Sequence, residues 1–155
     1  LKQMGAKLEV QKDAISVSKS SLTGGEFDVS DCPDLFPVVA ALGAAADGRT
    51  VLYGIERLRY KESDRAEAMV EGLQGMGIEV VQHEDSVVIR GGAPQGSVTN
   101  PWSDHRIAMA FAVLGLVAEG KTTILDADCV SKSYTGFWNE MEVLGMKVRR
   151  LNDEQ

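Results

Sequence analysis

Two cations stand four residues apart in the segment Lys61-Glu62-Ser63-Asp64-Arg65. If this segment begins a helix, Lys61 and Arg65 share one face, where like charges repel by ~0.2–0.5 kcal/mol. An anionic ligand between them would turn that repulsion into attraction. Glu62 is then a carboxylate among cations, which suits proton transfer in a closed site. The alternative is a solvated helix start with Ser63 or Asp64 as its cap.

Polar residues also precede two apolar segments of the chain. Asp31-Cys32-Pro33-Asp34 comes before one of them, and Ser103-Asp104-His105-Arg106 comes before the other. Asp34 and Arg106 are 72 residues apart and occupy equivalent positions in the first turn of each expected helix. Free N–H groups and a partial positive charge make a helix N-terminus suitable for an anion. Helix capping by the first residue of each polar segment is the structural alternative.

A third segment, Asp128-Cys129-Val130-Ser131-Lys132-Ser133, holds a counterpart of the first. Lys132 lies 71 residues after Lys61, and we expect it at a strand end just before a helix, on the same side of the molecule. The candidate site residues are Asp34, Lys61, Glu62, Arg65, His105, Arg106 and Lys132. Their charges predict a small substrate with several negative charges, and carboxylates that transfer protons.

Short motifs recur along the chain at intervals of about 70 residues. Asp47-Gly48-Arg49-Thr50 is similar to Glu119-Gly120-Lys121-Thr122. Met76-Gly77-Ile78-Glu79-Val80 is similar to Leu144-Gly145-Met146-Lys147-Val148, and Met4-Gly5-Ala6-Lys7-Leu8 is a third copy. The recurrence predicts an array of similar structural units.

Each expected unit begins with a helix that is apolar on almost every side, first 35–46 and then 107–117. Such a helix is expected to be buried all round. A strand rich in Thr, Val, Ile and Leu follows, at 50–55 and again at 122–125. We expect the two apolar helices to pack side by side.

An amphipathic helix comes next in each unit, on the outside of the fold. Its apolar positions follow helical spacing from Ala66 to Met76 and from Phe137 to Leu144. A glycine ends each of these helices, at Gly75 or Gly77 and at Gly145. Strands are expected at residues 7–10, 14–18, 79–82 and 86–90, with a loop at residues 91–96.

These patterns predict an α/β fold of repeated β-α-β-α-β-β units with mixed sheets. We expect one partial domain, comprising the end of one repeat (1–24), a second repeat (25–95) and a third (96–155). Because the first repeat has only its last part and the chain begins with Leu1, we expect a piece of a longer protein.

The composition limits the classes of function. Sixteen Lys and Arg against 23 Asp and Glu give a net charge of −7, which disfavours nucleic-acid binding. The longest apolar run is shorter than the ~18 residues that a membrane span needs. Cys32 and Cys129 are too few for a disulfide framework and lack the spacing of a zinc site, so we expect a reduced, cytoplasmic setting.

The three charged segments resemble the signatures of one known family. Residues 61–65, Asp104-His105-Arg106-Ile107-Ala108-Met109-Ala110 and residues 128–132 are similar, in order and spacing, to the C-terminal part of the 3-phosphoshikimate 1-carboxyvinyltransferases, or EPSP synthases. The pair Pro33-Asp34 ahead of an expected apolar helix is also similar to this family. The resemblance runs over essentially the whole chain and implies the last third of such an enzyme, most of one domain.

The resemblance implies a fold and a reaction. The family has two similar domains, each an inside-out α/β barrel of three β-α-β-α-β-β units, with the active site between them. Its reaction moves the enolpyruvyl group of phosphoenolpyruvate to the 5-hydroxyl of shikimate 3-phosphate and releases phosphate. This step of the shikimate pathway leads toward chorismate and the aromatic amino acids. No metal and no organic cofactor are implied.

The resemblance also implies catalytic roles. Asp34 is similar to the base that contacts the attacking hydroxyl, and Lys61 to the cation beside that hydroxyl. Glu62 is similar to the group that handles the proton at the phosphoenolpyruvate methylene. His105 is implied to support Glu62 or the phosphate.

Binding roles follow in the same way. Arg65 and Arg106 resemble clamps on the carboxylate and phosphate of phosphoenolpyruvate, for which bidentate arginine is well suited. Lys132 resembles the residue that binds the leaving phosphate, and Asp104 is expected to orient its neighbours or cap its helix. The implied substrate-binding set is Asp34, Lys61, Arg65, Arg106 and Lys132.

The implied partners are phosphoenolpyruvate, shikimate 3-phosphate and the missing N-terminal part of the same enzyme. We expect the 155-residue chain alone to turn over nothing. Two other functions stay open. One is an enolpyruvyl transferase acting on UDP-N-acetylglucosamine, whose motifs match residues 61–65 and 104–106 poorly. The other is a non-catalytic α/β module that binds an anion.

Overall fold

A computed structural model describes residues 1–151 of the chain. A 3₁₀ helix, η1 (Lys2–Met4), leads into an antiparallel hairpin of β1 (Lys7–Val10) and β2 (Ile15–Ser18). The next unit consists of β3 (Glu26–Asp28), η2 (Pro33–Leu35), α1 (Phe36–Ala45), β4 (Arg49–Tyr53), η3 (Glu56–Tyr60), α2 (Arg65–Gly75), β5 (Glu79–Gln82) and β6 (Ser86–Arg90). The last consists of β7 (Val98–Thr99), α3 (His105–Gly115), β8 (Thr123–Ile124), η4 (Ala127–Lys132) and α4 (Phe137–Val143).

The central sheet has four strands in the order β3-β4-β6-β5. β3 and β4 run parallel, whereas β6 is antiparallel to both β4 and β5, with Leu52 opposite Val87 and Val80 opposite Ile89. These four side chains lie on the buried face. The sheet is therefore mixed, as predicted, and β7 and β8 form a short parallel pair below it.

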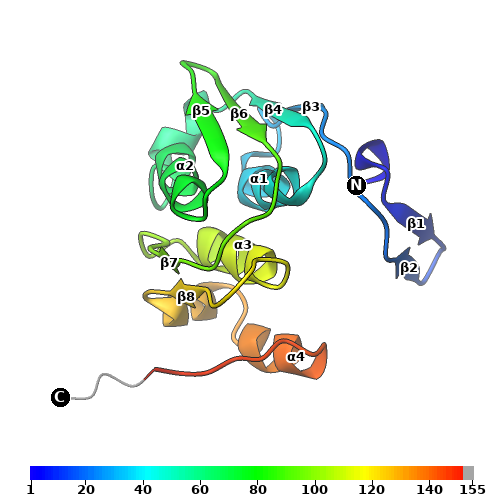
Figure 1. The fold of residues 1–155 in the computed structure, drawn as a ribbon, viewed down its shortest axis with the longest axis vertical. Coiled ribbons are helices and arrows are strands. Elements are labelled where there is room, and N and C mark those ends of the chain that lie inside the picture. Colours follow the sequence, from blue (N-terminus) through cyan, green and yellow to red (C-terminus); the bar gives the residue numbers. More distant parts are fainter. Residues whose placement is uncertain (152–155) are drawn as a thin grey trace.

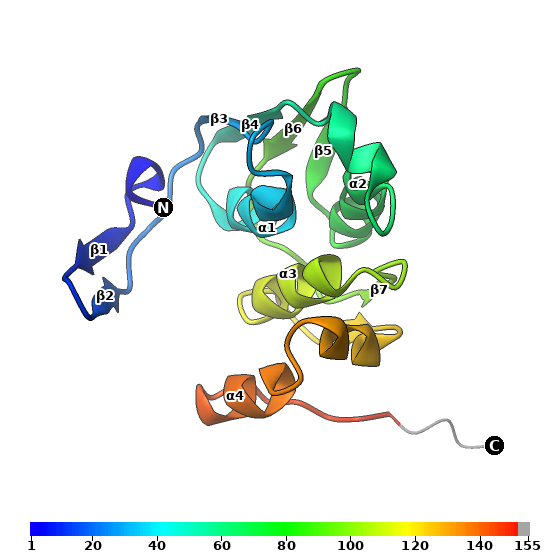
Figure 2. The same cartoon turned by 180° about the vertical axis from the view of Figure 1, so that it is seen from behind.

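The helices are stacked in layers beneath this sheet. Figures 1 and 2 show α1 and α2 side by side against one sheet face, with α3 below them and α4 at the far end. α1 and α3 pack against each other, as expected. Both helices contribute small side chains to the shared core, among them Ala40, Ala44 and Ala110.

α1 departs from the prediction of burial on every side. Val38 is 38% exposed, because no element of the described chain covers that edge of the helix. The burial of α3 agrees better with the prediction, because α1 and α2 cover the helix on one side and η4 covers it on the other. The helix begins two residues earlier than expected, at His105.

The recurrence of motifs corresponds to a recurrence of backbone hydrogen bonds. Two backbone hydrogen bonds near residues 23 and 24 have equivalents 72 residues later. The bond from Thr23 N to Met4 O (2.9 Å) corresponds to that from Gln95 N to Met76 O (2.8 Å). The bond from Gly24 N to Asp47 O (2.8 Å) corresponds to that from Gly96 N to Glu119 O (2.6 Å). Gly77 and Gly145 both have left-handed backbones, with φ of 77° and 101°. Of the two glycines expected at the end of the first amphipathic helix, Gly75 is the last helical residue of α2 and Gly77 is the left-handed residue that follows it. Within residues 1–151, no helix is long and apolar enough to cross a membrane.

Candidate active site

Arg65, the first residue of α2, is fully buried and binds three carboxylates. Its Nε donates to Asp104 Oδ2 at 2.7 Å, one Nη to Asp34 Oδ1 at 2.6 Å and the other Nη to Glu62 Oε2 at 2.6 Å. Burial by itself lowers the pKa of Arg65, but the hydrogen bonds to Asp104 and Asp34 outweigh burial and raise it. The guanidinium is therefore a fixed cation that holds three segments of the chain together.

Asp34 is the point where three cations converge. Arg65 lies 2.6 Å from one oxygen of the carboxylate and Lys61 Nζ 3.8 Å from the same oxygen, while an Nη of Arg106 lies 3.0 Å from the other. The hydrogen bond from Arg65 is the main cause of the lowered pKa of Asp34, and the charges of Arg106 and Lys61 add to it. Asp34 and Arg106, equivalent positions in the two units, thus bind each other directly. We call Asp34, Lys61, Glu62, Arg65, Asp104 and Arg106 the Arg65 cluster.

Helix starts bring this cluster together. Pro33 has the fixed backbone angle of a first helical turn and begins η2, which places Asp34 just ahead of α1. Asp64 caps α2 by accepting from Glu67 N at 3.1 Å, so that Arg65 opens the helix. Asp104 caps α3 by accepting from the backbone N–H of Arg106 at 2.9 Å. The ion pairs described above therefore connect the N-terminal ends of three helices.

The structure corrects the expected relation between Lys61 and Arg65. Lys61 lies outside α2, at the end of η3, where its backbone is extended. The two cations therefore share no helix face. The anion between them is the carboxylate of Asp34, which both side chains approach.

The alternative interpretation, in which Asp31 and Ser103 cap the two apolar helices, is also wrong. The 3₁₀ turn of η2 separates Asp31 from α1, whose N-terminal end has no side-chain cap. Ser103 has a left-handed backbone with φ of 56°, and the next residue, Asp104, has the extended backbone and the acceptor that a cap needs. Asp64 is confirmed as the cap of α2.

His105 and Arg106 open α3 with unsatisfied nitrogens. His105 is only 7% exposed, and neither its Nδ1 nor the buried Nε of Arg106 has a hydrogen-bond partner among residues 1–151. No hydrogen bond joins His105 to Glu62 in this part of the chain. Buried polar groups normally have partners, so these two nitrogens depart from the usual pattern.

Lys132 lies at the end of η4 and not at the end of a strand, which corrects that expectation. Its Nζ donates to the backbone carbonyl of Ser103 at 2.7 Å, immediately before the cap of α3. Lys132 thus lies beside the N-terminal end of α3 but makes no ion pair with the Arg65 cluster in the described residues.

A strained segment that was not expected from the sequence precedes α3. Trp102 and Ser103 both have positive φ, as does Asp126, whose carboxylate accepts the Ser103 hydroxyl at 2.6 Å. Non-glycine residues in this conformation cost about 1–3 kcal/mol each and concentrate at functional sites. No repeat motif or spacing in the sequence signals this contact.

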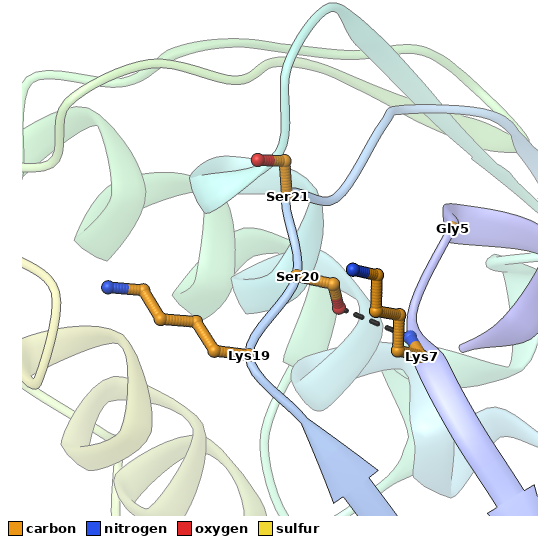
Figure 3. Close-up of a pocket in the computed structure, with 5 residues that line it drawn as sticks. All are labelled: Gly5, Lys7, Lys19, Ser20 and Ser21. Atoms are coloured by element: carbon orange, nitrogen blue, oxygen red, sulfur yellow. Dashed lines mark hydrogen bonds between the residues drawn. The ribbon is translucent and has the colours of Figure 1, made fainter.

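A surface pocket lies away from the Arg65 cluster, at the open end of the β1–β2 hairpin (Figure 3). It is lined by Gly5, Lys7, Lys19, Ser20 and Ser21, none of which is a candidate site residue. The side chains of Lys7 and Lys19 lie on opposite sides of the chain in this view, so their charges do not converge. Within residues 1–151, His, Cys, Asp and Glu side chains form no group of three that could hold a metal.

Known proteins that are similar to this chain belong to the family indicated by its three charged segments. The family model described as EPSP synthase (3-phosphoshikimate 1-carboxyvinyltransferase) matches residues 1–141. The chain belongs to the EPSP synthase family. It is 42% identical over 148 residues to the 3-phosphoshikimate 1-carboxyvinyltransferase of Dehalococcoides mccartyi strain BAV1, and 44% identical over 150 residues to that of Clostridium kluyveri. Each match covers 96% of this chain and 35% of the relative, so the chain spans about a third of the length of these curated relatives.

Solved structures of the family have the same fold. An EPSP synthase from Acinetobacter baumannii superposes with a TM-score of 0.89 at 33% identity, over 96% of this chain and 38% of that one. The enolpyruvyl transferase NikO from Streptomyces tendae superposes at 0.78 with 21% identity, over 96% and 34%, which shows a shared fold alone. The predicted enolpyruvyl transferase fold, present as a partial domain, is confirmed.

Proposed function

We propose that this chain supplies part of an active site that transfers the enolpyruvyl group of phosphoenolpyruvate to the 5-hydroxyl of shikimate 3-phosphate and releases phosphate. The convergence of Lys61, Arg65 and Arg106 on Asp34 is the observation that supports this most directly. Three cations around one carboxylate suit a donor with two anionic groups, with the carboxylate beside it as a base.

The unsatisfied nitrogens of His105 and Arg106 add to this support. Both residues belong to the first turn of α3, where free N–H groups already favour an anion. A phosphate or carboxylate at this position would accept hydrogen bonds that the described chain leaves unmade. Lys132, whose Nζ donates to the backbone carbonyl of Ser103, is proposed to interact with the same group.

Proton transfer can then be assigned to the two half-exposed carboxylates. Asp34 takes the proton of the attacking 5-hydroxyl, while Lys61 stabilises the developing negative charge on that oxygen. Glu62 supplies a proton to the methylene carbon of phosphoenolpyruvate and removes one again when phosphate leaves. Preorganised cations stabilise the negatively charged tetrahedral intermediate more than the separate substrates.

The remaining part of the site is proposed to come from a longer protein. We infer that residues 1–155 are a single partial domain with unit boundaries near 24 and 95. The partner is then the rest of the same enzyme, which would supply most contacts to shikimate 3-phosphate. By this proposal the isolated chain binds anions but releases no phosphate.

A chimeric enzyme tests the proposal. The corresponding third of the Dehalococcoides mccartyi relative is replaced by this chain, and phosphate release from phosphoenolpyruvate and shikimate 3-phosphate is measured. We expect a working enzyme in which Asp34→Asn or Glu62→Gln lowers kcat by about 10²-fold or more. Glu67→Gln is the matched control, because Glu67 is exposed and makes no ion pair among the described residues.

Three outcomes would contradict the proposal. Full activity of both carboxylate variants would indicate a non-catalytic anion-binding module. Phosphate release with UDP-N-acetylglucosamine in place of shikimate 3-phosphate would indicate the other transferase. Turnover by the isolated 155-residue chain would show that no further part is needed.

A further inference from the structure

Asp104 divides its two carboxylate oxygens between two parts of the fold. Oδ1 accepts the backbone N–H of Arg106 at 2.9 Å and caps α3. Oδ2 accepts Arg65 Nε at 2.7 Å and the hydroxyl of Ser63 at 3.3 Å. The residue is fully buried, so both oxygens are committed to these partners.

The cap of α2 shows that capping alone does not require this arrangement. Asp64 performs the same task with one oxygen on Glu67 N, without deep burial and without an ion pair among residues 1–151. A helix cap needs a single acceptor, which Ser, Thr or Asn also provides. Burying a carboxylate is costly unless the charge is paired, so the buried charge of Asp104 must be explained by Arg65.

We propose that Asp104 is a positioning residue that sets the guanidinium of Arg65 relative to the N-terminal end of α3. This inference rests on the proposed function, because it deepens the role of the same site. The bond to Nε leaves the outer edge of the guanidinium, with both Nη atoms, directed at Asp34 and Glu62. That edge is the one that binds a phosphate or carboxylate in bidentate fashion. One buried carboxylate thereby orients the guanidinium of Arg65 and fixes the backbone of Arg106 at the start of α3.

Asp104→Asn separates this role from capping. An amide has one acceptor oxygen, so asparagine can cap α3 or accept from Arg65 but cannot do both. Asp64→Asn is the matched control, since it makes the same change at a cap outside the Arg65 cluster. The probe is inorganic phosphate, titrated into the isotope-labelled 155-residue chain and followed by NMR. The Nε–H resonance of Arg65 reports the bond to Asp104.

We expect Asp104→Asn to weaken phosphate binding by about tenfold, and Asp64→Asn to change it less than about twofold. In the unsubstituted chain, the Arg65 Nε–H is expected to stay protected from exchange when phosphate saturates the site, while the Nη resonances shift. This second measurement needs no variant and stands even if Asp104→Asn fails to fold.

Three results would overturn the inference. One is a folded Asp104→Asn chain with unchanged phosphate affinity. Another is loss of Nε–H protection on phosphate binding, and the third is absence of phosphate binding to the unsubstituted chain. A chimeric enzyme without turnover, combined with tenfold weaker phosphate binding by Asp104→Asn, would refute the proposed function but support this positioning role.

Discussion

Replacing Asp34 with asparagine is expected to tighten the binding of inorganic phosphate to this chain, although Asp34 belongs to the proposed catalytic set. Its carboxylate holds Lys61, Arg65 and Arg106 at distances of 2.6–3.8 Å. An incoming anion must compete with this carboxylate for the cations and is also repelled by it. Asparagine keeps the size of the side chain and removes the charge.

The magnitude follows from the geometry. Two unit charges 4 Å apart interact by about 1 kcal/mol in water and about 4 kcal/mol at the effective dielectric of a protein surface. The side chain of Asp34 is 48% exposed, so solvent screening places the effect near the lower value. We expect a gain of about 1–2 kcal/mol, or roughly 5–30-fold tighter binding.

Calorimetric titration with phosphate at constant pH and ionic strength is the assay. Asp31→Asn is the matched control, because it changes the net charge equally at an exposed residue that makes no ion pair within residues 1–151. Unchanged or weaker binding to the Asp34→Asn chain, or equal tightening in the control, would refute the reasoning. Either result would mean that the three cations do not converge on a shared anion site.

The same carboxylate predicts a pH dependence. Because Arg65 lowers the pKa of Asp34, the group stays charged until the pH falls below its ordinary value of about 3.9. The difference in phosphate affinity between the native chain and Asp34→Asn should therefore persist from pH 8 to pH 5 and close only in stronger acid. By linkage, the stability from these ion pairs is present above about pH 4 and is lost as the pH falls through the lowered pKa. Acid unfolding followed by circular dichroism should show this component in the native chain but not in the variant.

The remaining predictions concern packing and thiol reactivity. Gly72→Ala should destabilise the fold by about 1–3 kcal/mol in urea unfolding, because a Cβ there would overlap the ring of Phe111 where α2 meets α3. Gly75→Ala, whose Cβ would have no neighbour nearer than 3.6 Å, should be neutral or stabilising, and equal losses in both variants would contradict this packing. Cys129 is buried and burial raises its pKa, so a thiol reagent at neutral pH should modify the half-buried Cys32 first, as mass spectrometry can show. Faster modification of Cys129 would indicate that η4 opens readily.

Local patterns in the sequence predicted most of the elements. The antiparallel strands, both amphipathic helices and the apolar helices α1 and α3 occur within one or two residues of their expected positions. This works because hydrophobic periodicity and glycine positions depend on neighbours within a few turns of the chain. The recurrence at about 70 residues was visible for the same reason, since each unit contains similar short motifs at equivalent positions.

The charged residues of the Arg65 cluster were also identifiable in the sequence, but their partners were not. Lys61 and Arg65 were expected to flank a ligand on one helix face, whereas the structure places Asp34 between them. Sequence spacing describes a helix face only if both residues are helical, and Lys61 lies just outside. Lys61 instead follows η3, whose Leu58 is fully buried.

Residue types, spacing and repeats by themselves determined the order of most elements and the residues that bear charge, and the resemblance of three charged segments to known signatures indicated the family. Only the tertiary structure decided that Asp34 binds Arg106 from the next unit, that Asp104 pairs with Arg65 across 39 positions, and that His105 has an unsatisfied nitrogen. The physical reason is that an ion pair requires two groups within about 4 Å, and that distance depends on how helices from separate units pack. No local pattern contains that information.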